Sequence, residues 1–106
     1  MQISFGIDGE TKFLKVMYEV LFSNSFKKDY KRIKKRGYNL LLLTEVFDQL
    51  VDRGCVDSLF FPHKLVGNYV GCWECHIQAD WLFIWKIDEN SKLIQLIATG
   101  THSDLF

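Results

Sequence analysis

Three strand-like runs near the C-terminal end of the chain limit what it can fold into. The segments VGCWECHI, WLFIWKI and KLIQLIAT are rich in aromatic and β-branched residues, and only the short loops QAD and DENS separate them. Because such short loops join antiparallel neighbours, we expect the three runs to pair in the order in which they occur. The sequence therefore predicts an antiparallel β-meander.

Two helices are predicted before the meander. In SNSFKKDYKRIKKRG the apolar residues Phe26, Tyr30 and Ile33 recur at helical spacing, with a Ser or Asn available as N-cap and Gly37 as the stop. The segment NLLLLTEVFDQLVDRG repeats this pattern with its own asparagine cap and glycine stop. The helices should pack as a hairpin on one side of the sheet.

The run MYEVLF, which begins at Met17, suits a first strand. The predicted fold class is therefore α+β: a single domain in the order β-α-α followed by the meander, with the helices on one face of the sheet. We assign the domain to residues 17–106 and interpret residues 1–16 as an N-terminal extension of uncertain origin.

Composition narrows the class of protein. A chain of 106 residues with 48% hydrophobic and 25% charged residues fits one globular domain and excludes a disordered chain. No apolar run approaches the roughly 20 residues that span a bilayer, and the first 20 residues do not resemble a signal peptide. We expect a cytoplasmic protein with no membrane partner.

Basic residues are concentrated in the first predicted helix, although the net charge of the chain is zero. Seven of the 13 basic residues lie within ten positions, and such a local positive field suits the phosphates of RNA. The alternative is an ordinary solvated helix face. The candidate RNA- or ribosome-binding residues are Lys27, Lys28, Lys31, Arg32, Lys34, Lys35 and Arg36.

The motif CxxCH in GCWECHIQADW is the spelling of a c-type haem attachment site. Haem attachment needs both thiols on the same side of the porphyrin, whereas strand alternation turns Cys72, with Glu74 and His76, away from Cys75. Zinc is disfavoured by the same alternation, and Cys55 supplies no second cysteine pair. We therefore expect neither metal nor cofactor, and three free thiols.

Three histidines and a carboxylate are the candidate catalytic residues. His63 lies in the loop before the meander, His76 near the end of a strand, Asp80 in the following hairpin and His102 after the last strand. Imidazoles and carboxylates suit proton transfer near neutral pH without a metal, and RNA carries its own nucleophile in the 2′-hydroxyl. Cleavage would need a base, an acid and a cation for the phosphate charge.

Two aromatic residues are candidates for stacking on an unpaired base, Trp81 after the hairpin and Phe106 at the end of the chain. A place in the hydrophobic core is the alternative for Trp81.

The combination of H-x-L-x-G, H-x-x-x-D-W and T-G-T-H-x-x-L-F resembles the YafQ branch of the RelE-type toxins of bacterial type II toxin-antitoxin systems. The resemblance covers about residues 17–106. It implies a RelE-like α+β domain that acts as a ribosome-dependent mRNA endonuclease, or mRNA interferase. It also implies a cognate antitoxin, mRNA and the ribosome as partners, and operator DNA only through the antitoxin complex. By position, the family's acid, base and substrate-positioning groups correspond to His63, His76, Asp80, His102 and Phe106.

One departure from the resemblance concerns the phosphate-binding cation. The family usually carries an arginine four residues before the C-terminal histidine, where this chain has Ala98. Loss of a comparable preorganised donor costs other enzymes about 10²- to 10³-fold in rate. The position predicts an attenuated toxin, a natural variant in which Lys86 or Lys64 supplies the charge, or a catalytically inactive binding module that acts with an antitoxin in operon repression.

Overall fold

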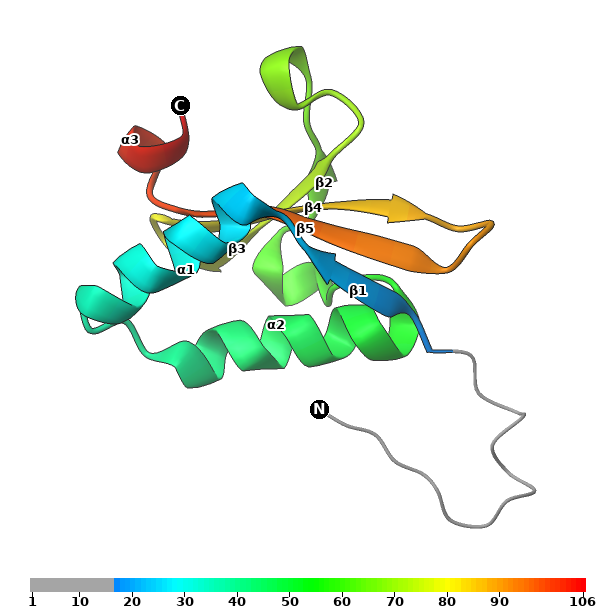
Figure 1. Cartoon of the computed structure of the whole chain (residues 1–106), viewed down its shortest axis with the longest axis horizontal. Helices are drawn as coiled ribbons and strands as arrows, with labels where there is room; N and C mark the ends of the chain where they lie inside the picture. Colours follow the sequence, from blue (N-terminus) through cyan, green and yellow to red (C-terminus); the bar gives the residue numbers. More distant parts are fainter. Residues whose placement is uncertain (1–16) are drawn as a thin grey trace, which may run out of the picture.

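The computed structural model describes residues 17–106, which form a five-stranded sheet with two helices packed on one face (Figure 1). The expectation for residues 1–16 concerns a segment outside the described residues. Two short 3-10 turns, at Ser58–Phe60 and Gly67–Tyr69, flank the second strand. The other elements are β1 (Glu19–Phe22), α1 (Asn24–Lys35), α2 (Leu40–Arg53), β2 (His63–Lys64), β3 (Trp73–Gln78), β4 (Trp81–Asp88), β5 (Leu93–Gly100) and α3 (His102–Leu105).

Both predicted helices begin and end where the sequence places their signals. The Ser23 hydroxyl accepts a hydrogen bond from the Phe26 amide at the start of α1, and the Asn39 side chain caps α2 in the same way. Gly54 ends α2 in the left-handed conformation, with φ of 75°, and Gly37 adopts a similar conformation just beyond α1. The predicted caps and stops are confirmed.

The sheet has the strand order β1-β5-β4-β3-β2. Strands β3, β4 and β5 pair antiparallel, which confirms the predicted meander. Strand β1 pairs with β5 in parallel, because α1 and α2 carry the chain back before the meander begins, so the sheet is mixed. The parallel pairing, the two-residue edge strand β2 and the C-terminal helix α3 were not predicted.

The two faces of the sheet differ in what covers them. On one face α1 and α2 bury the main hydrophobic core, which includes Phe26 and Ile33 of α1 and Val46 and Leu50 of α2. On the opposite face, here called the open face, a smaller apolar cluster around Ile84 is covered by single side chains from the loops and α3. Figure 1 shows α3 and the turn after β2 on the side of the sheet away from α2. No helix within residues 17–106 is long and apolar enough to cross a membrane.

Candidate active site

The three histidines predicted to act together lie in a row on the open face. His63 is on β2, His76 on β3, and His102 is the first residue of α3. The ring centroids of His63 and His76 are 6.0 Å apart, and those of His76 and His102 are 6.4 Å apart. Residues from three distant parts of the sequence therefore come within the reach of one phosphodiester group.

Asp80 fixes the orientation of His102. The Asp80 carboxylate accepts from the His102 backbone amide and from its ring, with Nδ1 3.0 Å from Oδ1. These hydrogen bonds lower the pKa of Asp80 below its ordinary value. Because Nδ1 donates to Asp80, the Nε2 atom of His102 is directed away from the pair and is available to a substrate.

Arg36, the residue that caps the C-terminal end of α1, holds α3 in place. Asp104 closes a capping box with Thr101, and the Arg36 guanidinium donates two hydrogen bonds to the Asp104 carboxylate, at 2.7 and 2.9 Å. Arg36 holds the pKa of Asp104 well below its usual range. Gly100 leaves room for this contact, because a Cβ there would lie 2.8 Å from an Asp104 oxygen. The helix that carries His102 is thus tied to α1.

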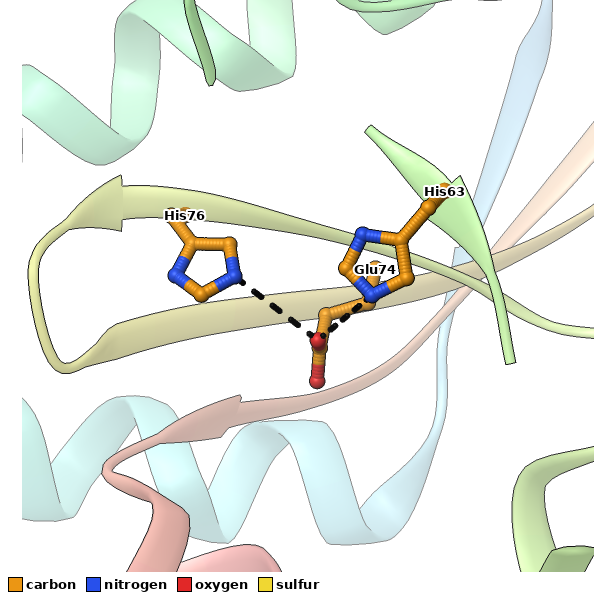
Figure 2. A group of neighbouring side chains, drawn as sticks. All are labelled: His63, Glu74 and His76. Carbon is orange, nitrogen blue, oxygen red and sulfur yellow. Dashed lines mark ion pairs between the residues drawn. The ribbon is translucent and has the colours of Figure 1, made fainter. Parts of the chain in front are cut away.

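Glu74 is a site residue that the sequence did not single out. It pairs with His63 across β2 and β3, and its Oε1 lies 3.1 Å from His63 Nε2 and 4.0 Å from His76 Nε2 (Figure 2). Only 4% of Glu74 is exposed. Strand alternation already placed Glu74 on the same face as His76, so the signal was present. The sequence did not show that Glu74 lies opposite His63, because it did not predict the pairing of β2 with β3.

The two aromatic residues predicted to stack on a base differ in exposure. Phe106 is 64% exposed and lies 6.0 Å from the His102 ring, so it is free to stack on a base. Trp81 is 2% exposed in the helix-side core, where its indole N–H donates to Thr99, so the expected stacking role for Trp81 is wrong. Phe61 takes its place as a candidate, since it is exposed and its ring contacts His76 edge-on. An open hollow of about 550 Å³ lies beside these two residues.

Ala98 lies on the open face, 3% exposed and packed with Cys72 and Ile84. It is adjacent to a bulge in β5, which turns both Ile97 and Ala98 toward this side. Of the two lysines that could substitute for an arginine, only Lys86 is placed on the same face as Ala98. Lys86 follows Ile84 by two residues on β4 and so shares its face, whereas Lys64 lies over the Trp73 ring.

The cysteines behave as strand alternation predicts. Cys72 packs in the open-face cluster and Cys75 in the helix-side core, so the two thiols of CxxCH lie on opposite faces. All three cysteines are free thiols, as expected. Burial raises the pKa of Cys75 to about 12, so this thiol is inert at neutral pH. The group with metal-ligand geometry is instead His63, Glu74 and His76.

The basic run on α1 divides into two sets. The lysines are exposed, and most of them border one shallow groove with Arg32. Arg32 and Arg36 instead bind carboxylates, Arg32 through Asp29 and Arg36 through Asp104. The two arginines therefore brace the fold, and the surface open to a polyanion is formed by Lys27, Lys28, Lys31, Lys34 and Lys35.

A two-helix layer on a five-stranded mixed sheet, with histidines and carboxylates gathered on the open face, defines the class: a toxin of the RelE-like fold. The family model described as the bacterial toxin of type II toxin-antitoxin systems, YafQ, matches residues 18–106. The chain belongs to the YafQ toxin family.

Individual relatives are similar over most of their length. The chain is 27% identical to the mRNA interferase toxin YafQ of Escherichia coli K12 over 86% of this chain and 98% of the relative. The crystal structure of the E. coli DinJ-YafQ toxin-antitoxin complex matches with a TM-score of 0.77 and 27% identity, over 86% of this chain and 99% of that one. A metal-bound toxin from Helicobacter pylori matches with a TM-score of 0.77 and 31% identity, over 85% of this chain and all of that one.

Proposed function

We propose that residues 17–106 form an mRNA interferase, a cytoplasmic toxin that cleaves messenger RNA on the ribosome by metal-independent attack of the 2′-hydroxyl. The observation that carries this proposal is the row of His63, His76 and His102, with Glu74 and Asp80 bound to its two ends. The activity in the name of the E. coli relative supports it.

The geometry supports two proton-transfer groups. One is His102, whose Nδ1 is held by Asp80 while Nε2 faces outward. The other is Glu74 with His63 and His76. In cleavage, a base removes the proton of the 2′-hydroxyl, the oxygen attacks phosphorus to form a 2′,3′-cyclic phosphate, and an acid protonates the departing 5′-oxygen. In-line attack places these two oxygens on opposite sides of phosphorus, and His76 and His102, with ring centroids 6.4 Å apart, can face one oxygen each.

Substrate positioning falls to the residues around this row. Phe106 lies beside His102 at one end of the row, and Phe61 lies beside His76 in its middle. Both aromatic side chains are exposed and can each stack on a base. Lys86 supplies a positive charge on the same face, while the lysines of α1 provide a field for the phosphates of ribosomal RNA.

An antitoxin is the proposed protein partner, as the DinJ-YafQ complex supports for the E. coli relative, and operator DNA would be met only through that complex. An apolar groove of about 420 Å³ between β1, α1 and α2 suits an amphipathic antitoxin helix, and Lys27 and Lys31 on its rim suit acidic residues. Phe47→Asp at the groove should abolish co-purification with the antitoxin while leaving RNA cleavage intact. Unchanged co-purification would exclude this groove.

A second candidate function rests on Ala98. With an alanine in the position of the usual arginine, the chain is either an attenuated nuclease or a binding module that acts only with its antitoxin in operon repression.

Mapping cleavage of one translated message, with and without ribosomes, tests the nuclease. We expect cuts only with ribosomes, a loss of about 10²- to 10⁴-fold in His102→Ala, and a similar loss in Glu74→Gln. Equal cleavage by the wild type and both variants would exclude this site, and no cleavage by any of them would leave the binding module.

A further inference from the structure

Three potential metal ligands converge on the open face outside the His102–Asp80 pair. The ligand atoms of His63, Glu74 and His76 all lie within 4.8 Å of one another. Figure 2 shows the two imidazole rings, from β2 and β3, turned toward the Glu74 carboxylate. The three side chains stand on paired strands rather than on a mobile loop, so their relative position is set by the sheet.

The spacing suits a small divalent cation. Ligands about 2.0–2.1 Å from a tetrahedral Zn²⁺ lie roughly 3.3 Å from each other. The distance from His63 Nε2 to Glu74 Oε1 is 3.1 Å, which is close to this separation. The distance from His76 Nε2 to the same oxygen is 4.0 Å, and a small rotation of the partly exposed His76 ring would shorten it. Two imidazoles and one carboxylate form a ligand set that prefers borderline cations such as Zn²⁺ or Cu²⁺ to Mg²⁺ or Ca²⁺.

The outer contacts of His63 prepare it as a ligand. Its Nδ1 lies 3.0 Å from the Phe61 carbonyl, and because a carbonyl only accepts, Nδ1 carries the proton. Without a second proton, Nε2 therefore presents a lone pair to a carboxylate oxygen, which is also an acceptor. Two acceptors 3.1 Å apart need a proton or a cation between them.

Glu74 contributes a second, independent observation. Its Oε2 atom is buried and has no hydrogen-bond partner within residues 17–106. A buried carboxylate oxygen without a hydrogen-bond partner destabilises the fold. A bound cation would neutralise the carboxylate charge and could be coordinated by either of its oxygens. The group is thus short of positive charge at the point where its ligand atoms converge.

We propose that a borderline divalent cation binds to His63 Nε2, the Glu74 carboxylate and His76 Nε2, and that this cation switches off RNA cleavage. The inhibitory half rests on the proposed nuclease function, since the same three groups would serve there in proton transfer. A chelated imidazole or carboxylate has donated its lone pair to the metal and no longer accepts a proton. RNA supplies its own nucleophile, so the reaction has no need of the water that the cation would activate.

Binding is tested first with Zn²⁺ on the full chain after treatment with a chelator that spares Mg²⁺. Calorimetry should give one Zn²⁺ per chain. Affinity should fall at least about 10-fold in Glu74→Gln and in His63→Ala, and Co²⁺ should give the absorption of a tetrahedral site. Cys55→Ser, which removes the exposed thiol, and His102→Ala, outside the group, should bind like the wild type. Binding that is absent, or that survives Glu74→Gln, overturns the proposal.

Cleavage of a translated message is then measured against Zn²⁺ in Mg²⁺-containing buffer, with toxin-free translation as the control for the ribosomes. We expect the metal-depleted chain to cleave, and half-inhibition to coincide with the Zn²⁺ dissociation constant. Stimulation by Zn²⁺, or cleavage unaffected at saturation, overturns the inhibitory role while the nuclease stands. If the depleted chain binds Zn²⁺ but never cleaves, the nuclease proposal and the inhibitory role both fail, and the ligand assignment stands.

Discussion

Ala98 occupies the position at which the resemblance to the YafQ toxins predicts an arginine. Its side chain is buried against Cys72 and Ile84, and the partly buried Leu65 and Tyr69 pack on the same cluster. The position thus lies beneath the loop after β2, in the floor of the open face. No residue of β5 carries a positive charge that could replace that of an arginine. Lys86 on the neighbouring strand β4 lies on the same face and is the best-placed substitute.

Ala98→Arg should therefore raise activity at the expense of stability. A guanidinium held beside the reacting phosphate should increase ribosome-dependent cleavage by at least about 10-fold and strengthen growth arrest. Forcing a long side chain beneath Leu65 should cost roughly 1–3 kcal/mol in the free energy of unfolding. Ala98→Met is the matched control, because it adds similar length without charge. No gain in cleavage over the present chain would end the attenuation hypothesis.

Single residues also show what sequence reasoning can and cannot reach. Strand alternation correctly sent Cys72 and Cys75 to opposite faces, because that periodicity is local. Trp81 was wrongly proposed to stack on RNA, since its burial depends on Tyr38 and Thr99, which come from distant segments. Strand alternation placed Glu74 on the correct face, but the sequence suggested no role for it. Its role depends on His63, which lies opposite it on β2.

At the scale of elements, α3 is a four-residue helix too short to be stable alone, and its position is set by contacts with α1. The sequence predicted both long helices and the meander, whose signals repeat over many residues. It did not predict α3, β2 or the parallel pairing of β1 with β5. These are short elements held by partners far away in the chain.

Asp104→Asn should loosen α3 and with it His102. Weakening the capping box and the Arg36 contact should lower the free energy of unfolding by roughly 1 kcal/mol, or about 4–8 °C in melting temperature. Cleavage should fall as His102 loses its fixed position, while Ser103→Ala, one residue away on α3, should change neither.

The stability that Asp104 contributes should depend on pH. Because Arg36 lowers the pKa of Asp104 in the folded state, the stability from Asp104 is fully present above the ordinary aspartate range, at about pH 4. It is lost as pH falls further, through the lowered pKa. The difference in melting temperature between wild type and Asp104→Asn should therefore shrink below about pH 4. A difference that stays constant down to about pH 2 would contradict the role given to this carboxylate.

At the scale of the whole molecule, a net charge of zero conceals an uneven distribution. The exposed lysines of α1 lie on the helix side of the domain, whereas the histidine row lies on the open face, and α3 connects the two through Arg36. In the proposed function, the lysine surface of α1 would hold ribosomal RNA and the open face would bind the message. The sequence revealed the basic run, but only the structure shows which of its members are already bound to carboxylates.

Replacing the α1 lysines should therefore weaken ribosome binding without touching the chemistry. Lys31→Gln and Lys34→Gln should each reduce the steepness of log affinity against log salt concentration by about 0.9, the value for one lost phosphate contact on a duplex, and the double variant should reduce it by about 1.8. Lys92→Gln removes the same charge far from α1, where the lysine contacts Tyr18 and Glu89, and should leave the slope unchanged. Equal slopes for Lys31→Gln and Lys92→Gln would show that bulk charge, and not the α1 surface, holds the ribosome.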